Sequence, residues 1–257
     1  YSLYTMLRDC FDANKDEIIS SGEAQEDWNR VLARGSSYAK SVTVNGTVFR
    51  YLDFSGVNFS SLKGIEYFVN LQGLSFASSS ITDIACLSSL TQLNYLDLSD
   101  NAITDISAFA YSDALQYLNL ADNQITSIEA LRYLPALETL DLTNNKITDF
   151  DPLTVTDSLI SLTLTGMKNA NGQTFDNDPA TLYSLATIQI NNPTVTFVYD
   201  QNILIGPSAL IAAKVIHDVE EINRVNQTLY LPTTYYYSDG SEIFAYKLNW
   251  FADDTQT

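Results

Sequence analysis

The amino-acid sequence predicts an α/β solenoid of 22-residue coils, with a parallel sheet on its concave side and a cap at each end. An apolar frame recurs at a constant interval, because 71 − 49 and each later difference between frame starts is 22. Self-similarity at this period is typical of solenoids, whose repeats bury their apolar faces only by stacking on their neighbours. The frame starts at Phe49, Leu71, Leu93, Leu115, Leu137 and Leu159.

Residues 93–101, LNYLDLSDN, are the most complete copy of the frame and predict a short strand followed by a turn. Leu96 and Leu98 are two residues apart, so both side chains point from the same face of the strand into the core. The Asn101 amide can satisfy backbone groups that the turn leaves unpaired. Stacked copies of this residue predict a ladder of Asn101, Asn123 and Asn145.

The remainder of each coil is too short for a full helix. In the same coil Ile103, Ile106 and Phe109 are the apolar residues that close the other side of the core. We therefore expect extended or 3₁₀ segments on the convex side.

The motifs ITDI at residues 81–84 and 103–106, and ITSI at 125–128, resemble the 22-residue leucine-rich repeats of the internalin group of bacterial surface proteins. Weaker copies extend the predicted array to residues 49–198. FRYLDFSGV at 49–57 fits a first coil, and LATIQINNP at 185–193 fits a seventh strand after a short insertion at 168–181. The resemblance implies a non-enzymatic, secreted or cell-surface module that binds a protein in adhesion.

Composition agrees with an extracellular binding module. The chain has 257 residues and a net charge of −18, from 31 acidic and 13 basic residues. Nucleic acid and anionic membranes need a basic partner surface, so the charge argues against both. No stretch approaches the ~20 apolar residues of a membrane span. The chain begins at Tyr1 with no signal peptide, and we expect it to be an excised mature fragment that is monomeric.

Few residues offer chemistry for catalysis. His217 is the only histidine, so a Ser/His/Asp triad would depend on one residue outside the repeats. Asp53, Asp97 and Asp141 occupy frame position five, where the repeat itself supplies an aspartate, and a structural role is favoured over a carboxylate pair. Cys10 and Cys86 lie in different structural units, and two buried free thiols are favoured over a disulfide.

Residues 1–48 form the predicted N-terminal cap, and DANKDEIISSGE at 12–23 has the spacing of a calcium loop. Calcium takes several oxygen ligands, which alternate acidic or amide side chains on a tight loop can supply together with a closing Glu. Apolar residues before and after the loop predict a helix on each side. The predicted ligands are Asp12, Asn14, Asp16, the Ile18 carbonyl and Glu23.

Position six of this loop is Glu17, where the calcium motif has Gly, so a residue with a Cβ must make the sharp turn. A loop retained for packing alone is therefore the alternative to bound calcium. The cap resembles the EF-hand-like N-terminal cap of surface leucine-rich proteins from Firmicutes and gut bacteria. Between the cap and the repeats, alternating valines around Asn45 and Gly46 predict a tight hairpin at residues 41–49.

The sequence changes character in residues 199–257. LYLPTTYYYSDGSEIFAYKLNW at 229–250 has two aromatic or apolar runs around the turn residues 238–241, which predicts a hairpin. It resembles the first half of a bacterial Ig-like domain, so this region is either a partial Ig-like domain or a β-rich C-terminal cap. Residues 207–226 have apolar spacing that fits a helix, whereas the resemblance would make part of them a strand.

Recognition by a surface remains as the predicted function. Frame positions three and five point to the concave side, and Tyr95 and Tyr117 should be neighbours ~5 Å apart there. Aromatic and amide groups on a rigid face suit a protein hot spot, or a sugar. The predicted contacts are Tyr51, Tyr95, Asp97, Tyr117 and Asn119. We expect an extracellular protein partner, with host proteins among the candidates; a glycan-binding module or a structural spacer is the alternative.

Overall fold

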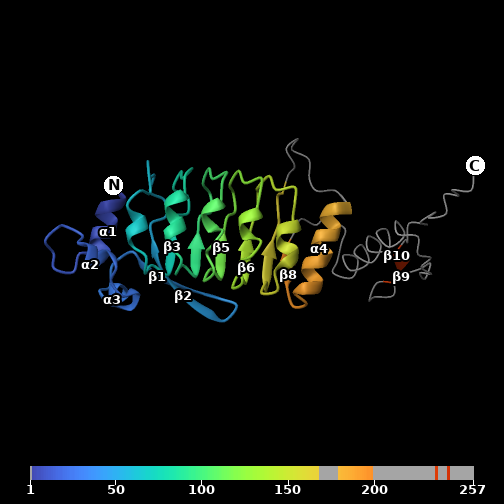
Figure 1. Cartoon of the computed structure of the whole chain (residues 1–257), viewed down its shortest axis with the longest axis horizontal. Coiled ribbons are helices and arrows are strands. Elements are labelled where there is room, and N and C mark those ends of the chain that lie inside the picture. The colour runs from blue at the N-terminus through green and yellow to red at the C-terminus, as the bar shows by residue number, and fades with distance from the viewer. Residues whose placement is uncertain (1, 168–178, 199–234, 237–241, 244–257) are drawn as a thin grey trace, which may run out of the picture.

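The computed structural model describes residues 2–167, 179–198, 235–236 and 242–243. Its described part is an elongated solenoid with a helical cap at the N-terminal end (Figure 1). The cap contains α1 (Leu3–Phe11), α2 (Ser21–Ala24) and α3 (Trp28–Ala33). The predicted helix-loop-helix is confirmed, with the second helical side divided between α2 and α3.

One eight-stranded sheet in the order β1 to β8 forms the concave side. A hairpin, β1 (Ala39–Val44) and β2 (Thr47–Asp53), leads into six three-residue strands. Every pairing from β2 to β8 is parallel, and Tyr95, Tyr117 and Thr139 lie side by side in register. The solenoid prediction is therefore confirmed. The strands are β3 (Gly73–Ser75), β4 (Tyr95–Asp97), β5 (Tyr117–Asn119), β6 (Thr139–Asp141), β7 (Ser161–Thr163) and β8 (Thr196–Val198).

Short 3₁₀ helices form the convex side, as the residue count of each coil predicts. An Asp side chain caps three of them: Asp83, Asp105 and Asp149 each accept the backbone N–H two residues later. The aspartate of the ITDI motif is thus explained as a turn cap. The 3₁₀ helices are η1 (Ile65–Tyr67), η2 (Ala85–Ser89), η3 (Ser107–Phe109), η4 (Glu129–Leu131) and η5 (Asp151–Val155).

A continuous apolar core runs between the two sides. In the third coil Leu96, Leu98, Ile103, Ile106 and Phe109 are all buried. The strand leucines and the residues of the convex side thus meet as the frame predicts. Each coil buries its leucines against those of the next, which explains why the repeats need each other.

The predicted asparagine ladder lies at the edge of this core. The Nδ2 of Asn123 donates to the carbonyls of Leu98, Leu120 and Ala121 at 3.0–3.1 Å, and its Oδ1 accepts the N–H of Ile103. Asn101 and Asn145 repeat the arrangement one coil away on either side. Since Leu98 belongs to the preceding coil, each amide joins two coils as well as closing its own turn.

The residue before the asparagine position turns the chain with a positive φ angle. Asp100, Asp122 and Asn144 have φ angles of 54°, 56° and 54°, in the left-handed region that Asn and Asp tolerate better than most residues. The last coil has Gly166 there, with φ 64°. A Cβ on Gly166 would come within 1.8 Å of the Asn144 Oδ1, so a side chain would force Asn144 to move.

The N-terminal cap closes the first coil by packing and by hydrogen bonds. Phe11 meets Phe68 edge to face, with ring centroids 4.5 Å apart. Arg34 donates to the carbonyls of Cys10 and Phe11, at the end of α1. The Nδ2 of Asn70 donates to the Gln25 carbonyl. The cap and the solenoid therefore share one core, as a capping element must.

The predicted seventh strand at residues 185–193 is wrong. Most of this segment lies in α4 (Pro179–Asn191), and the strand that pairs with β7 is β8. Buried residues of the segment have helical spacing, at Thr181, Ser184, Leu185 and Ile188. α4 takes the place of a 3₁₀ helix on the convex side, where it packs against η5.

Two strands of the C-terminal region are described, β9 (Tyr235–Tyr236) and β10 (Glu242–Ile243). They pair antiparallel on either side of residues 237–241, and the predicted hairpin is confirmed. His217, the ambiguous segment 207–226 and the remainder of the Ig-like resemblance lie outside the described residues. The insertion is partly outside as well, at residues 168–178.

Replacing one ladder residue should strongly destabilise the solenoid. Asn123→Ala leaves buried carbonyls and a buried N–H without partners, at about 1–3 kcal/mol each, so we expect a loss of at least about 3 kcal/mol. Urea unfolding followed by circular dichroism measures it. Gln124→Ala, at the exposed next position, is the control and should stay within about 0.5 kcal/mol. Equal effects of the two changes would contradict a stabilising role of the asparagine ladder.

Candidate functional site

The β1–β2 hairpin is the feature that most affects the concave side. Asn45 and Gly46, with φ angles of 48° and 85°, make its two-residue turn, as the Asn-Gly pair predicts. The hairpin does not simply lie between the cap and the first coil. β2 pairs with β1 from Thr47 to Leu52, and only Leu52 and Asp53 pair with β3. The predicted first coil strand is therefore the end of a hairpin strand.

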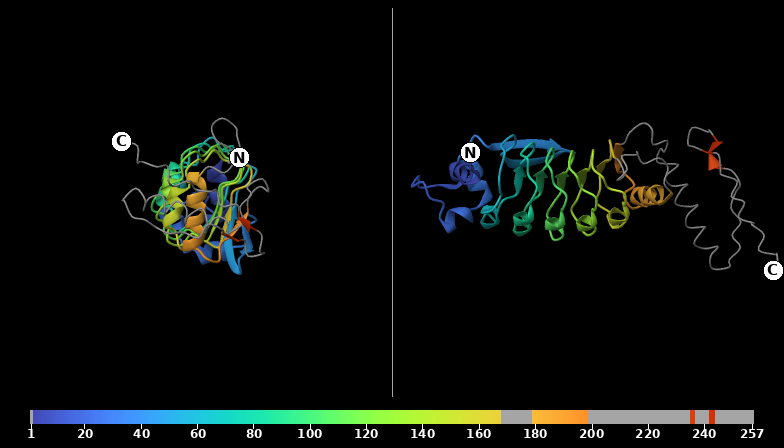
Figure 2. Two further views of the ribbon diagram at one scale, coloured as in Figure 1. Left: turned by 90° about the vertical axis from the view of Figure 1, so that its right-hand side faces the viewer. Right: turned by 90° about the horizontal axis from the view of Figure 1, so that it is seen from above.

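The hairpin lies along the solenoid axis on the concave face (Figure 2). The Phe49 ring is 5.6 Å from Tyr95 and 6.2 Å from Tyr117, centroid to centroid. At the tip, the Nδ2 of Asn45 donates to the Thr139 Oγ1 at 3.0 Å. These contacts reach successively from β4 to β6. The hairpin thus runs across β4, β5 and β6 and covers part of the concave face.

Alternate residues of the hairpin strands point toward the sheet, and the residues between them point away from it. Val42 is paired with Phe49 across the hairpin, and directly opposite residues share a face. Phe49 is buried and Val42 half-buried, whereas Val48 and Arg50 on the other face are exposed. The inner face is therefore apolar and the outer face faces solvent.

Gly73 marks where the hairpin crosses the sheet. It occupies the concave position that Tyr95 and Tyr117 occupy in the next two coils. A Cβ there would lie 2.2 Å from the Arg50 carbonyl oxygen and 2.8 Å from the Tyr51 Cβ. Only a residue without a side chain permits this close approach, so Gly73 is required by the hairpin rather than by its own coil.

Three tyrosines stack beneath and beside the hairpin. Tyr95 and Tyr117 rings are 4.5 Å apart and nearly parallel, at 10°, and Tyr51 stacks on Tyr95 at 4.6 Å. The predicted Tyr95–Tyr117 neighbourhood is confirmed. Tyr95 lies at the concave position that its frame position predicts, but the expectation that its ring is open to a partner is wrong, because the side chain is 5% exposed. The physical reason is the hairpin, which supplies Phe49 and Tyr51 to that part of the face.

Burial raises the pKa values of these phenols still further above neutral pH. Desolvation raises the pKa of Tyr117 to about 12, with further contributions from the carboxylates of Asp97 and Asp141. The pKa of Tyr95 is raised further, again mainly by burial. The pKa of Tyr51 is raised by burial and by Asp53. At neutral pH all three hydroxyls therefore keep the proton and are hydrogen-bond donors.

The acidic and amide residues at frame position five have a structural task. The Oδ1 atoms of Asp97, Asn119 and Asp141 each accept the backbone N–H two residues later, at 2.9–3.0 Å. Asp53 does the same for Ser55. The structural role predicted for these aspartates is thus supported. All four remain half-buried on the concave face, so roles for Asp97 and Asn119 in binding stay a prediction.

The predicted calcium loop has the turns that its motif requires. Glu17, in the position of the motif's Gly, has a φ angle of 67°, and Lys15 has 61°. Asp12 accepts the backbone N–H groups of Lys15 and Glu17 at 2.7 and 2.9 Å. The sharp turn therefore forms despite the Cβ.

The side chains of this loop are bonded mainly to its own backbone. Glu23 accepts from Ser20 and Ala13, and these hydrogen bonds lower its pKa to about 2. Asp16 accepts the N–H of Ile18 and the amide of Asn14. Among the described residues, no three acidic, histidine or cysteine side chains are grouped to hold a metal ion. The five predicted ligands thus share one loop without forming such a group, and calcium binding stays a prediction.

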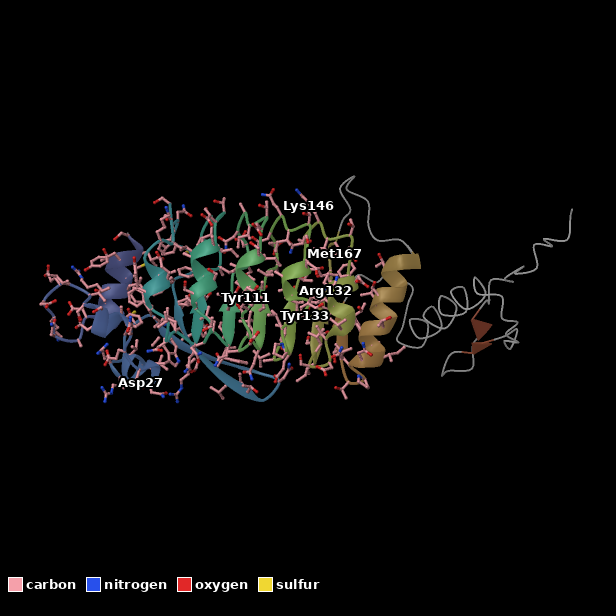
Figure 3. All side chains as sticks on the ribbon, in the orientation of Figure 1. Asp27, Tyr111, Arg132, Tyr133, Lys146 and Met167 are labelled. Atoms are coloured by element: carbon pink, nitrogen blue, oxygen red, sulfur yellow. The ribbon has the colours of Figure 1, made fainter. Side chains whose placement is uncertain are left out.

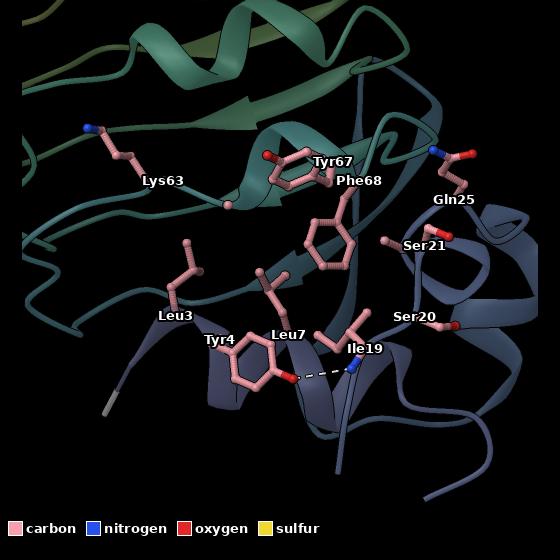
Figure 4. A pocket seen from close by; sticks show the side chains of 12 residues that line it. Leu3, Tyr4, Leu7, Ile19, Ser20, Ser21, Gln25, Lys63, Tyr67 and Phe68 are labelled. Atoms are coloured by element: carbon pink, nitrogen blue, oxygen red, sulfur yellow. Dashed lines mark hydrogen bonds between the residues drawn. The ribbon is translucent and has the colours of Figure 1, made fainter. Parts of the chain in front are cut away.

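A cavity of about 360 Å³ lies between the cap and the first coil (Figure 4). Leu3 and Leu7 of α1, Ile19 after the loop and Phe68 after η1 line it. The Ile19 N–H donates to the Tyr4 hydroxyl across one side. Its lining is mostly apolar, so the cavity favours packing over catalytic chemistry.

The two cysteines are free, as the sequence favours. Cys10 is buried, whereas Cys86 is half-buried rather than buried as expected. Burial raises the pKa of each thiol to about 11. Neither is a thiolate at neutral pH, which argues against a nucleophilic role.

The sequence frame missed two surfaces. It assigned Tyr51 to a plain coil strand, although Gly73 in a concave position signals close approach of another segment. It also passed over Tyr67, Tyr111 and Tyr133, which the structure exposes on the convex side. Their signal was available, because all three fall at frame position 19.

Comparison with known proteins identifies the class. Residues 69–111 and 113–155 match the family model for leucine-rich repeats, two copies, and the fold described above is the solenoid of such repeats. A search of curated protein sequences finds no match. No helix in the described part of the chain is long and apolar enough to cross a membrane.

Among solved structures, the fold is similar to that of an internalin, InlF, of Listeria monocytogenes. That structure aligns with a TM-score of 0.59 and 24% identity, over 82% of this chain and 53% of its own. This chain therefore spans about half of that structure. Internalin C2 of the same species aligns with a TM-score of 0.45 and 24% identity, over 62% of this chain and 76% of its own. A leucine-rich repeat protein of Leptospira interrogans aligns with a TM-score of 0.47 and 23% identity, over 62% of this chain and 38% of its own.

Removing the buried tyrosine should destabilise the protein and release the hairpin. Tyr95→Ala deletes a ring between Phe49, Tyr51 and Tyr117, and we expect a loss of about 3 kcal/mol. Urea unfolding measures the stability, and amide hydrogen exchange of residues 39–53 measures release. Tyr111→Ala is the matched control, because that ring is 82% exposed. A Tyr95→Ala protein as stable as the control, with a protected hairpin, would contradict the packing.

Calcium binding has its own test. An ion that binds only the folded state stabilises it by about 2.7 kcal/mol at a hundredfold excess over Kd. Thermal melts in millimolar calcium and in chelator should therefore differ, and Asp12→Ala should abolish the difference. Asp9→Ala, which removes an exposed carboxylate outside the loop, should preserve it. Identical melts of the unmodified protein would eliminate the site.

Proposed function

We propose that the chain is a non-catalytic protein-binding module, secreted or displayed at a bacterial cell surface, whose partner docks on the concave side. The main observation in support of this proposal is a rigid parallel sheet that presents polar side chains in register, one set for each coil. Solenoids of this kind offer extended concave surfaces for binding. Because the same leucines that fix the sheet are fully buried, the surface is ordered before any partner arrives, which lowers the cost of binding.

The docking surface that best fits the geometry is composite. Its first part is the outer face of the hairpin, where Ser41, Val48 and Arg50 are exposed. Its second part is the sheet beyond the hairpin tip, where Thr163 is half-buried and Thr196 and Val198 are exposed. A partner would contact Arg50 on the hairpin and the acid and amide row on the strands.

The tyrosines have different parts in this proposal. Tyr51 and Tyr117 are half-buried, so each can contribute a ring edge and a protonated hydroxyl to a partner. Tyr95 is buried and holds the hairpin in place, so its contribution is indirect. The row of Asp97, Asn119 and Asp141 keeps the carboxylate or amide atoms not used in its turns on the same side. Together these groups suit a polar protein surface with aromatic contacts.

A glycan-binding module and a structural spacer are the competing functions. Tyrosine rings with hydroxyl and carboxylate groups also fit a sugar, but the stacked faces of Tyr51, Tyr95 and Tyr117 contact one another. Since sugars bind aromatic rings through those faces, the geometry favours a protein. A spacer needs no ordered polar row.

A binding screen against extracellular proteins and glycans, followed by paired variants, tests the proposal. Thr163→Arg places a large charge on the concave face beyond the hairpin and should weaken a protein partner at least about tenfold. Thr126→Arg makes the same change at an exposed position outside the sheet and should leave affinity unchanged. Surface plasmon resonance measures both. Hits among glycans alone, no hits, or equal effects of the two variants would each overturn the proposal.

A further inference from the structure

A row of exposed side chains runs along the convex side at frame position 19. It contains Tyr67, Tyr111 and Tyr133, which are 65%, 82% and 77% exposed, and Val155. Ser89 occupies the same position in the second complete coil. Tyr111 and Tyr133 follow η3 and η4 on neighbouring coils (Figure 3). We name these two residues and their surroundings on η3 to η5 the convex ridge.

These tyrosines contribute little to the fold. A side chain about four-fifths exposed buries little apolar area, whereas Phe109 and Leu131 beneath the ridge are fully buried and fill the core. Tyrosine at high exposure is costly to solubility but is a preferred anchor in interfaces. The two rings therefore form an accessible aromatic surface rather than part of the packing.

The ridge is acidic. Residues 101–160 contain only two basic residues, Arg132 and Lys146. Arg132 is already paired, with its Nε 2.6 Å from Glu129 and an NH2 contact of 3.3 Å to Asp151. Lys146 lies at a different edge of the solenoid (Figure 3). The exposed carboxylates of residues 101–160 are Asp105, Asp113, Asp122, Glu129, Asp149, Asp151 and Asp157, of which Asp122 accepts a hydrogen bond from the Asn144 amide.

Some of these carboxylates have no task in the fold. Asp105 and Asp149 cap 3₁₀ helices, and Glu129 and Asp151 hold Arg132. By contrast, Asp113 and Asp157 lie two residues beyond frame position 19, on the coils of Tyr111 and Val155, and accept no hydrogen bond from the described residues. Acceptors beside an exposed ring are the groups that an arginine uses, since its guanidinium stacks on the ring and forms paired hydrogen bonds to carboxylates.

We propose that the convex ridge is a second interaction surface, which binds an arginine-rich segment of a protein partner. The guanidinium groups lie over Tyr111 and Tyr133, and neighbouring carboxylates accept their hydrogen bonds. Lysine is a poorer fit, because an ammonium group gives a point charge without a plane to stack. This surface is on the opposite side from the concave docking surface, so it does not depend on that proposal.

The test uses fluorescently labelled hexa-arginine and hexa-lysine peptides, measured by anisotropy in 150 mM salt. We expect hexa-arginine to bind at least about fivefold more tightly than hexa-lysine. The double change Tyr111→Ser and Tyr133→Ser should weaken hexa-arginine about tenfold and leave hexa-lysine nearly unchanged. Val48→Ser, which removes an exposed apolar side chain from the hairpin, is the control and should change neither.

A gain of binding tests the same surface in the other direction. Ser89→Tyr would fill the gap between Tyr67 and Tyr111 and should tighten hexa-arginine about threefold. Thermal melts of every variant establish that the exposed changes leave the fold intact. The proposal is overturned if hexa-arginine does not bind, if both peptides bind alike, or if the tyrosine double variant binds hexa-arginine as well as the unmodified protein does. Any of these results would leave the concave function standing.

Discussion

The backbone of the turn that follows each strand must be satisfied inside the core, and the rest of the solenoid depends on that constraint. Strands of three residues provide few ladder hydrogen bonds. The asparagine amide supplies further ones, since Asn123 donates to carbonyls of its own coil and of the coil before it. Because one amide must reach two coils, the coil length cannot vary freely, which explains the constant period of 22 through the centre of the chain. Val57 and Ser79 in the first two coils, and Met167 in the coil that starts at Leu159, replace the asparagine.

This constraint also explains where the hairpin can lie. The concave face accepts the two-stranded hairpin across it only where one coil has no side chain at the crossing point. Gly73 is the residue at that point, and the next two coils supply tyrosines that pack against Phe49 and Tyr51. The N-terminal part of the concave face is therefore filled by the chain itself. A partner that approaches this side contacts the hairpin first and the bare strands only toward β8.

Local periodicity explains why the sequence predicted so much of the fold and only part of the site. Leu96, Leu98 and Asn101 show their roles within nine residues, so the strand, core and ladder followed from the pattern. The position of the hairpin depends on contacts of Phe49 with Tyr95 and Tyr117. These residues come 46 and 68 positions later in the chain, so no local pattern contains the contacts. The segment at 185–193 has apolar residues at the frame's first, fourth and sixth positions, yet Leu185 and Ile188 also have helical spacing, and packing against η5 decides between the two. Calcium binding depends on side-chain convergence, which spacing alone does not fix.

The net charge of −18 has a different meaning on the two sides of the molecule. On the concave side, Asp53, Asp97 and Asp141 close strand turns, and Arg50 and Lys40 of the hairpin offset them in part. On the convex side there are the capping carboxylates and also Asp113 and Asp157, which close no turn. Arg132, on the same side, is already paired with Glu129 and Asp151. Long-range attraction alone therefore draws a cationic partner toward the convex ridge, whereas the concave surface must select by shape and hydrogen bonds. The two surfaces therefore select partners in different ways. They can bind at the same time on one solenoid, because a continuous core separates them and they share no side chain.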